Sequence, residues 1–230
     1  MFAGIGAAGH GLGFEALRTI ANMISHKYRC IFIHIPRTGG SSLEDLIWPE
    51  PRTEQELWMG FVSPYANRYQ TGGLQHLSAR NVRQVVGRDV FESYFKFSFV
   101  RNPWERAVSQ YSYLARRADL RRLLGKPGGI TFDDYLEKIA HIRHVQWEPQ
   151  MEFLHDDNGD LIVDFIGRFE NLENDAQVVL TRIGLPSRQL PHKQASAHGA
   201  YPGYYDSRAR DRVHALYAND IQKLGYEFGR

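Results

Sequence analysis

Residues 33–43 have the sequence Ile-His-Ile-Pro-Arg-Thr-Gly-Gly-Ser-Ser-Leu, and they join two kinds of pattern. The run before Pro36, residues 30–35, is short and mostly apolar, which predicts a buried strand. From residue 42 until Pro49, apolar side chains recur at helical spacing, at Leu43, Leu46 and Ile47. The stretch therefore predicts a strand, a turn and a helix in succession.

Residues 36–42, the first junction, have the composition of an anion site. Gly39 and Gly40 let backbone N–H groups face a ligand with no side chain in the way, and Arg37 lies at the mouth of the turn. The helix N-terminus adds partial positive charge. Hydroxyl groups supply further donors, on Thr38, Ser41 and Ser42. The alternative is a tight strand-to-helix turn that uses two glycines for its geometry alone.

A second strand-to-helix connection, residues 101–109, forms the second junction. Phenylalanines alternate with other residues over 95–100, which predicts a strand, and Pro103 follows. One helix face is then marked by Ala107, Val108, Tyr111, Leu114 and Ala118. Arg101 ends the strand and Ser109 lies two turns into the helix, so a guanidinium fork and a hydroxyl can meet one phosphate. Taken singly, an arginine at a strand end is usually solvated or salt-bridged, and Glu105 and Arg106 are equally expected to pair on the surface.

Both junctions resemble those of sulfotransferases that use 3′-phosphoadenosine 5′-phosphosulfate (PAPS), in the branch that contains carbohydrate O-sulfotransferases (sulfotransferase family 2 type). The resemblance spans residues 30–228 and includes further similar stretches at 75–78, 147–150, 168–172 and 190–205. It implies that PAPS binds across both junctions, with its 5′-phosphosulfate on the first and its 3′-phosphate on Arg101 and Ser109. It also implies that Lys193 and Ser196, in a polar segment over 192–205, approach the nucleotide.

The family usually has lysine where this chain has Arg37. The resemblance implies that this position contacts the transferring sulfuryl group and the bridging oxygen. An arginine there stabilises charge that develops on the leaving phosphate. It does not donate a proton, because the pKa of its guanidinium stays above about 12. We therefore expect Arg37 to act by electrostatic stabilisation alone.

Transfer to a hydroxyl requires a base, and His76 is the candidate. It precedes a predicted helix that is capped by Ser78, so its side chain is expected to project from a loop. The resemblance implies a catalytic histidine at this position. Glu148 and His34 are the other candidates, although His34 lies within a predicted buried strand, where a hydrogen-bonded structural role suits it better.

The remaining sequence predicts one α/β domain with three layers. Its 230 residues, 43% of them hydrophobic, suffice for one core. A helix is expected after Thr131, a strand over 161–165, and helices that end at Gly184 and Gly225. Alternating strands and helices favour a central, mainly parallel sheet covered on both faces, with ligands at the carboxyl ends of its strands. The resemblance implies the P-loop-NTPase-like sulfotransferase fold for residues 29–230, preceded by a mobile or helical extension over 1–28.

Several motifs favour a structural interpretation. The glycine pattern over 4–9 fits a dinucleotide fingerprint, but no strand precedes it. Asp164 follows an apolar run like a Walker B aspartate, yet the first junction has Gly40 where a Walker A loop requires lysine. The basic run over 116–126 fits a solvated helix face better than a platform for an acidic acceptor. Phe169 fits the core better than a stack on adenine.

The net charge and the cysteine content limit which binding partners and which disulfides can be expected. The net charge is +2, which requires neither a nucleic acid nor a membrane as partner, and the single cysteine, Cys30, rules out an internal disulfide. The sequence shows no secretory signal pattern, apolar membrane span or Asn-x-Ser/Thr sequon. A cytoplasmic enzyme is therefore expected, while an anchor removed upstream and a homo-oligomer stay open.

Three functions follow as alternatives. The first is a PAPS-dependent O-sulfotransferase that needs no metal, uses His76 as general base and releases 3′,5′-bisphosphoadenosine (PAP). Its acceptor is expected to be a carbohydrate by resemblance alone. The second is a P-loop-type nucleotide kinase, and the third is a non-catalytic module that binds an anion or a glycan.

Overall fold

The computed structural model describes residues 23–48, 76–190 and 199–230. The glycine pattern over 4–9 lies outside these ranges, as do Lys193 and Ser196, so their expected roles stay predictions.

The described residues form a four-stranded sheet in the order β1-β2-β3-β4. Its strands are β1 (Ile24–Ser25), β2 (Cys30–Ile33), β3 (Phe95–Val100) and β4 (Phe165–Arg168). The pairs β2–β3 and β3–β4 are parallel, and only β1 runs antiparallel to its neighbour. The expectation of a mainly parallel sheet is confirmed. Because β1 belongs to the sheet, the sheet also includes residues that the sequence assigned to the extension before residue 29.

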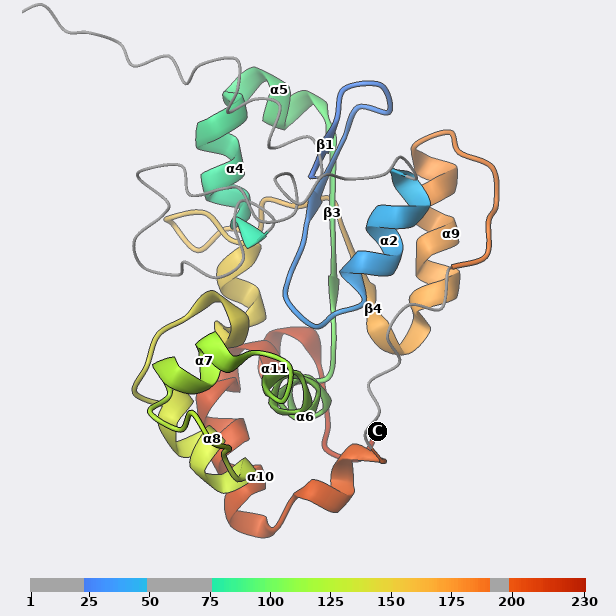
Figure 1. The fold of residues 1–230 in the computed structure, drawn as a ribbon. Coiled ribbons are helices and arrows are strands. Elements are labelled where there is room, and N and C mark those ends of the chain that lie inside the picture. The colour runs from blue at the N-terminus through green and yellow to red at the C-terminus, as the bar shows by residue number, and fades with distance from the viewer. Residues whose placement is uncertain (1–22, 49–75, 191–198) are drawn as a thin grey trace, which may run out of the picture.

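Helices cover both faces of the sheet, which gives the three layers expected from the sequence. On one face lie α2 (Gly40–Ile47) and α9 (Leu172–Arg182), and on the other lie α4 (Ala79–Val86) and α5 (Arg88–Ser93) (Figure 1). Every residue of β2 is buried, as are the last five of β3, as expected for parallel strands covered on both sides. Two apolar clusters fill the two interfaces, one around Phe32 and Phe97 and one around Ile31 and Ile33.

The other helices gather beyond the carboxyl end of the sheet around α6 (Pro103–Leu114) (Figure 1). They are α7 (Ala118–Leu123), α8 (Phe132–Ile139), α10 (Ser207–Leu216) and α11 (Ala218–Leu224). Short 3₁₀ turns complete the described part, at Val145–Trp147, Gln150–Phe153, Phe169–Asn171 and Tyr201–Tyr204. Helix α8 begins as expected, because Thr131 Oγ1 accepts a hydrogen bond from the Asp134 N–H, and α11 ends at Gly225 with a φ of 65°.

Two expected elements have different bounds. The strand predicted over 161–165 is instead β4, Phe165–Arg168, since Asp164 uses its side chain to bind the backbone N–H of Lys96, and Leu161 forms only an isolated bridge. The helix face expected to run from Ala107 to Ala118 is divided, because α6 ends at Leu114 and α7 begins at Ala118.

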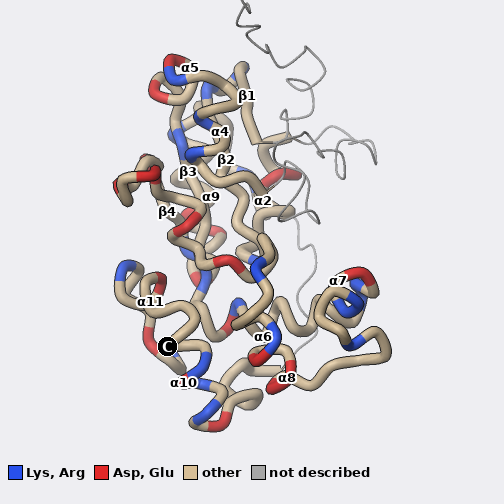
Figure 2. Tube along the Cα trace, turned by 90° about the vertical axis from the view of Figure 1, so that its left-hand side faces the viewer, with Lys and Arg blue, Asp and Glu red and all other residues tan. Residues whose placement is uncertain are grey.

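The basic run over 116–126 lies on and around α7, at the periphery of the molecule (Figure 2). Arg117 pairs with Asp119 at 2.6 Å, and Lys126 pairs with Asp134 at 3.3 Å. Arg121 donates instead to backbone carbonyls around it. These local pairings match the solvated helix face favoured by the sequence. None of the helices in the described ranges is long and apolar enough to cross a bilayer.

Candidate functional site

The first junction is a compact turn that leads from β2 into α2. Arg37 and Gly39 both adopt left-handed backbone conformations, with φ of 68° and 84°. Such a conformation is costly for a residue other than glycine, by about 1–3 kcal/mol, so the surroundings must hold Arg37 in place. The Thr38 hydroxyl is buried and donates to the Ile35 carbonyl at 2.9 Å, which closes the turn from within. Ser41 is exposed and Ser42 is buried.

Gly40 begins α2 against the imidazole of His34. A Cβ at position 40 would overlap the His34 ring, which explains why this position requires glycine. His34 is itself fixed, because its Nδ1 donates to the buried Glu44 carboxylate at 2.8 Å. His34 is 4% exposed. The structure therefore gives His34 the hydrogen-bonded structural place that the sequence favoured for it.

Arg101, at the start of the second junction, is buried with one unpaired donor. Its Nη1 donates to the Arg37 carbonyl at 3.3 Å, and its Nη2 pairs with Glu105 at 3.0 Å. Its guanidinium carbon lies 3.8 Å from the centre of the Phe169 ring. Within the described part of the chain, its Nε has no hydrogen-bond partner, although Arg101 is only 4% exposed. A buried, unsatisfied cationic donor is costly and favours an anion beside it.

Phe169 is half-buried against Arg101, so it belongs neither fully to the core nor to an open stacking surface.

The guanidinium of Arg37 reaches from the first junction to the second. Its Nε and Nη2 each donate to the Ser109 hydroxyl oxygen at 3.1 Å. It also lies over the Tyr113 ring, with its carbon 4.7 Å from the ring centre. Burial, followed by the charges of Arg101 and Arg116, lowers the pKa of Arg37 to about 10, below the value above about 12 expected from the sequence, yet the group stays charged at neutral pH. Arg37, Arg101 and Ser109 therefore form one cluster.

Arg106 holds the two junctions together, a role that the sequence interpretation missed. Its Nε donates to the Pro36 carbonyl at 3.0 Å, and its Nη1 donates to the Glu148 carbonyl at 3.0 Å. It is 3% exposed and does not pair with Glu105, so the expected surface pair is wrong. The spacing holds a usable signal, because Arg106 precedes Ser109 by one helical turn and so shares its face.

His76 presents a defined lone pair. Its Nδ1 lies 2.9 Å from the His34 carbonyl oxygen, which only accepts, so Nδ1 carries the proton and Nε2 is the accepting atom. The ring is half-buried. Burial and then the neighbouring His34 lower the pKa of His76 to about 3, which keeps it neutral.

A cavity of about 70 Å³ adjoins His76. Its lining also includes Ser78, Arg80, Asn81, Val145, Glu148, Glu152 and Phe153. Burial raises the pKa of Glu148, which accepts a hydrogen bond from Arg143 at 3.3 Å. Both base candidates, His76 and Glu148, therefore border the same space.

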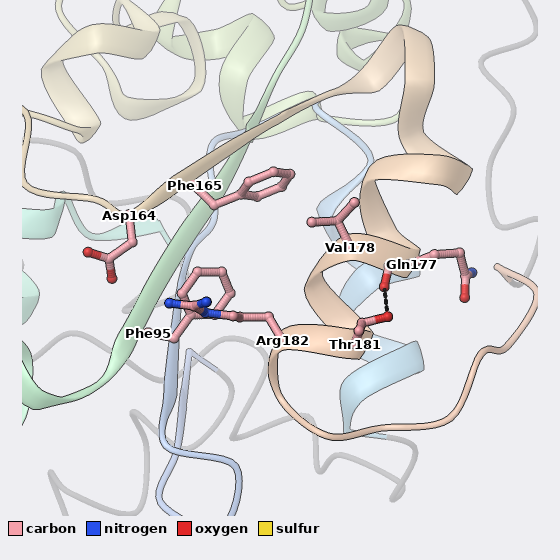
Figure 3. Close-up of a pocket in the computed structure, with 7 residues that line it drawn as sticks. All are labelled: Phe95, Asp164, Phe165, Gln177, Val178, Thr181 and Arg182. Carbon is pink, nitrogen blue, oxygen red and sulfur yellow. Dashed lines mark hydrogen bonds between the residues drawn. The ribbon is translucent and has the colours of Figure 1, made fainter.

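A larger cavity, of about 630 Å³, lies between β4 and α9 (Figure 3). Phe95 starts β3 and Asp164 precedes β4, so this cavity is at the amino ends of the parallel strands, opposite the two junctions. Asp164 pairs with Lys96 Nζ at 3.1 Å, in agreement with its expected structural role. The described ranges contain no cluster of three or more His, Cys, Asp or Glu residues suited to a metal ion.

Comparison with known proteins shows the family and the fold of this chain. The model of the sulfotransferase family matches residues 22–227. An uncharacterized protein of Archaeoglobus fulgidus is 34% identical over 105 residues, which are 46% of this chain and 80% of that protein. The crystal structure of mouse sulfotransferase SULT7A1 complexed with PAP superposes with a TM-score of 0.54, at 13% identity, and covers 91% of this chain and 90% of the mouse chain. The expected sulfotransferase fold is confirmed.

Proposed function

Because this chain belongs to the sulfotransferase family, we propose that it moves a sulfuryl group from PAPS to an acceptor hydroxyl. One observation carries the proposal. Two strand-to-helix junctions that are far apart in sequence meet at one cluster, where Arg37 donates to Ser109 and Arg101 donates to the Arg37 carbonyl. A nucleotide with phosphate at both ends of its ribose fits such a double site, because each junction supplies donors to one end.

The donor is proposed to lie across both junctions. Backbone N–H groups from Thr38 to Ser41, through Gly39 and Gly40, and the hydroxyls of Ser41 and Ser42 are assigned to its 5′ end, while the Thr38 hydroxyl, expected as a further donor, is already bonded to the Ile35 carbonyl. The N-terminus of α2 adds partial positive charge there. Arg101 and Ser109 are assigned to the 3′-phosphate, where the unpaired Nε of Arg101 supports the assignment. Lys193 and Ser196 remain proposed contacts outside the described residues.

His76 is proposed as the general base. Its neutral Nε2 would accept the proton of the acceptor hydroxyl as the oxygen–sulfur bond forms and the bond to the leaving phosphate breaks, which releases PAP. The partial positive charge at the α2 N-terminus would stabilise the negative charge on that phosphate, and the family resemblance assigns Arg37 to the same charge. The remaining acceleration is expected from holding both reactants in place.

A carbohydrate is the proposed acceptor. The cavity beside His76 carries Asn81, Glu148 and Glu152, whose amide and carboxylate groups form hydrogen bonds with hydroxyl-rich ligands. The cytoplasmic location expected from the sequence stays a prediction.

A thermal-shift titration with PAP, ATP and ATP–Mg²⁺ tests the donor. PAP at one hundred times its dissociation constant should stabilise the fold by about 2.7 kcal/mol. A preference for ATP–Mg²⁺ would favour the kinase alternative, which the position of Asp164 at the other end of the sheet already argues against.

Transfer of radiolabelled sulfate from PAPS to a panel of glycans tests catalysis. His76→Ala should lower the rate by about 10²–10⁴-fold, while His141→Ala, on an exposed turn, should leave it unchanged. Undiminished transfer by His76→Ala would remove His76 from the mechanism. PAP binding without transfer to any acceptor would favour the non-catalytic module.

A further inference from the structure

We infer that Arg37 binds the same phosphate as Ser109 and Arg101, so that it selects nucleotides with a 3′-phosphate. The inference rests on the proposed function and changes the place of one residue within it. The family resemblance puts position 37 beside the transferring sulfuryl group, whereas the contacts of Arg37 in this chain point to the other end of the donor.

The side chain of Arg37 is held along α6. Its two donors to Ser109 and its stacking on Tyr113 involve residues one helical turn apart on that helix. Its own carbonyl is held by Arg101 Nη1. The left-handed backbone at Arg37 sets the direction in which the side chain leaves the turn. Both the backbone and the guanidinium of Arg37 are therefore fixed by residues of α6 and the end of β3.

The charge of the cluster matches a phosphate monoester. Arg37 and Arg101 lie close enough to lower the pKa of Arg37, and Arg116 adds to the effect. Glu105 offsets one of these charges through its contact with Arg101. A phosphate monoester carries about −1.5 to −2 charges at neutral pH and so compensates the remainder. The buried, unpaired Nε of Arg101 lies in the same cluster.

Arginine supplies what lysine lacks at this position. A guanidinium is a planar fork that places two parallel donors on one oxygen or across one phosphate, and it stacks on an aromatic ring. Arg37 already shows both features, with two bonds to Ser109 and a stack on Tyr113. An ammonium group concentrates its donors on one nitrogen and would not reproduce this geometry.

Three nucleotides distinguish binding of the 3′-phosphate from binding of the 5′-phosphate: PAP, adenosine 3′-phosphate and adenosine 5′-phosphate. Their dissociation constants should be measured by calorimetry for the wild type, Arg37→Lys, Ser109→Ala and the double variant. Arg182→Lys is the matched control, because Arg182 stacks on Phe95 beside the cavity at the other end of the sheet (Figure 3). Circular dichroism without ligand should show that each variant is folded.

We expect Arg37→Lys to weaken the binding of PAP and of adenosine 3′-phosphate about tenfold or more, which is the loss typical of a charge-assisted hydrogen bond. The dissociation constant of adenosine 5′-phosphate should stay unchanged. The effects of Arg37→Lys and Ser109→Ala should be less than additive, since both residues serve one phosphate. Arg182→Lys should bind all three nucleotides as the wild type does.

Two results would overturn the inference alone. One is that Arg37→Lys lowers the affinity for PAP and adenosine 5′-phosphate but not for adenosine 3′-phosphate. The other is that the effects of Arg37→Lys and Ser109→Ala on affinity are fully additive. If the wild type binds none of the three nucleotides, the proposed function itself fails. The two failures are therefore distinguishable in one set of titrations.

Discussion

The first junction is built from backbone and small side chains, whereas the second is built from long side chains that are buried. The turn from Pro36 to Ser42 takes its shape from left-handed residues and from Gly40 packed on His34. The second junction depends instead on Ser109, whose hydroxyl accepts from the guanidinium of Arg37, and on Arg101, which donates to the Arg37 carbonyl. Sites made of backbone are encoded locally, while sites made of buried arginines depend on the whole fold.

Substitution of Arg106 should lower the free energy of unfolding the most, because the side chain of Arg106 joins the two junctions. Arg106→Met removes the bonds to the Pro36 and Glu148 carbonyls and leaves both acceptors without their partner. Hydrogen bonds to charged groups contribute about 1.5–3 kcal/mol each, so the free energy of unfolding should fall by about 3–6 kcal/mol. Urea unfolding measures the change.

The control for that experiment is Arg122→Met on the exposed side of α7, which should change the free energy of unfolding by less than about 0.5 kcal/mol. Equal unfolding midpoints for wild type and Arg106→Met would mean that the junctions are joined by other contacts.

Gly40→Ala tests the tight packing of the first junction alone. The added Cβ overlaps a His34 ring that Glu44 holds in place, so the ring or the helix start must move. We expect a loss of about 1–3 kcal/mol in the free energy of unfolding, measured with urea. Gly128→Ala is the matched control, since a Cβ there meets open space. A loss of the same size in both variants would contradict the proposed fit of His34 against the turn.

The pH dependence of activity and stability tests the role of His76, whose Nδ1 donates to the His34 carbonyl. With its pKa lowered to about 3, the folded protein keeps His76 neutral, so kcat/KM should show no acid limb near the ordinary histidine pKa of about 6.5. The unfolded chain binds a proton that the folded chain does not, so the free energy of unfolding should decrease as the pH falls from about 6.5 toward 3.

That decrease is at most about 1.4 kcal/mol per pH unit for this one group. Urea unfolding at pH 7.5 and pH 5, on wild type and His76→Asn, isolates its share. An acid limb near pH 6.5 in kcat/KM of the wild type, or an unfolding difference that His76→Asn leaves intact, would contradict the lowered pKa.

The smallest expected effect comes from Thr38, whose hydroxyl closes the turn by its bond to the Ile35 carbonyl. Thr38→Val keeps the shape and removes that bond, which should lower the free energy of unfolding by about 1 kcal/mol. The same measurement on Ser41→Ala, at an exposed position, should show little change. A larger loss for Ser41→Ala than for Thr38→Val would mean that the Ser41 hydroxyl, and not that of Thr38, stabilises the turn.

The sequence predicted what is local and missed what is tertiary. The turn at the glycines of the first junction, the strand before it and the cap of α8 at Thr131 all depend on near neighbours, and the structure agrees with each. The burial of Arg106 and the reach of Arg37 to Ser109 depend on how α6 packs against a turn far away in sequence, which no short-range pattern encodes. The strand expected over 161–165 shifted for the same reason, because Asp164 meets Lys96 of another strand.

The central claim is that the two junctions bind the two phosphates of one nucleotide, and ³¹P NMR of PAP tests it most directly. Both phosphorus resonances of PAP should shift on binding to the wild type. Ser109→Ala should alter the bound shift of the 3′ resonance alone, and Ser41→Ala that of the 5′ resonance alone. A single shifted resonance, or one phosphate that responds to both variants, would contradict the account.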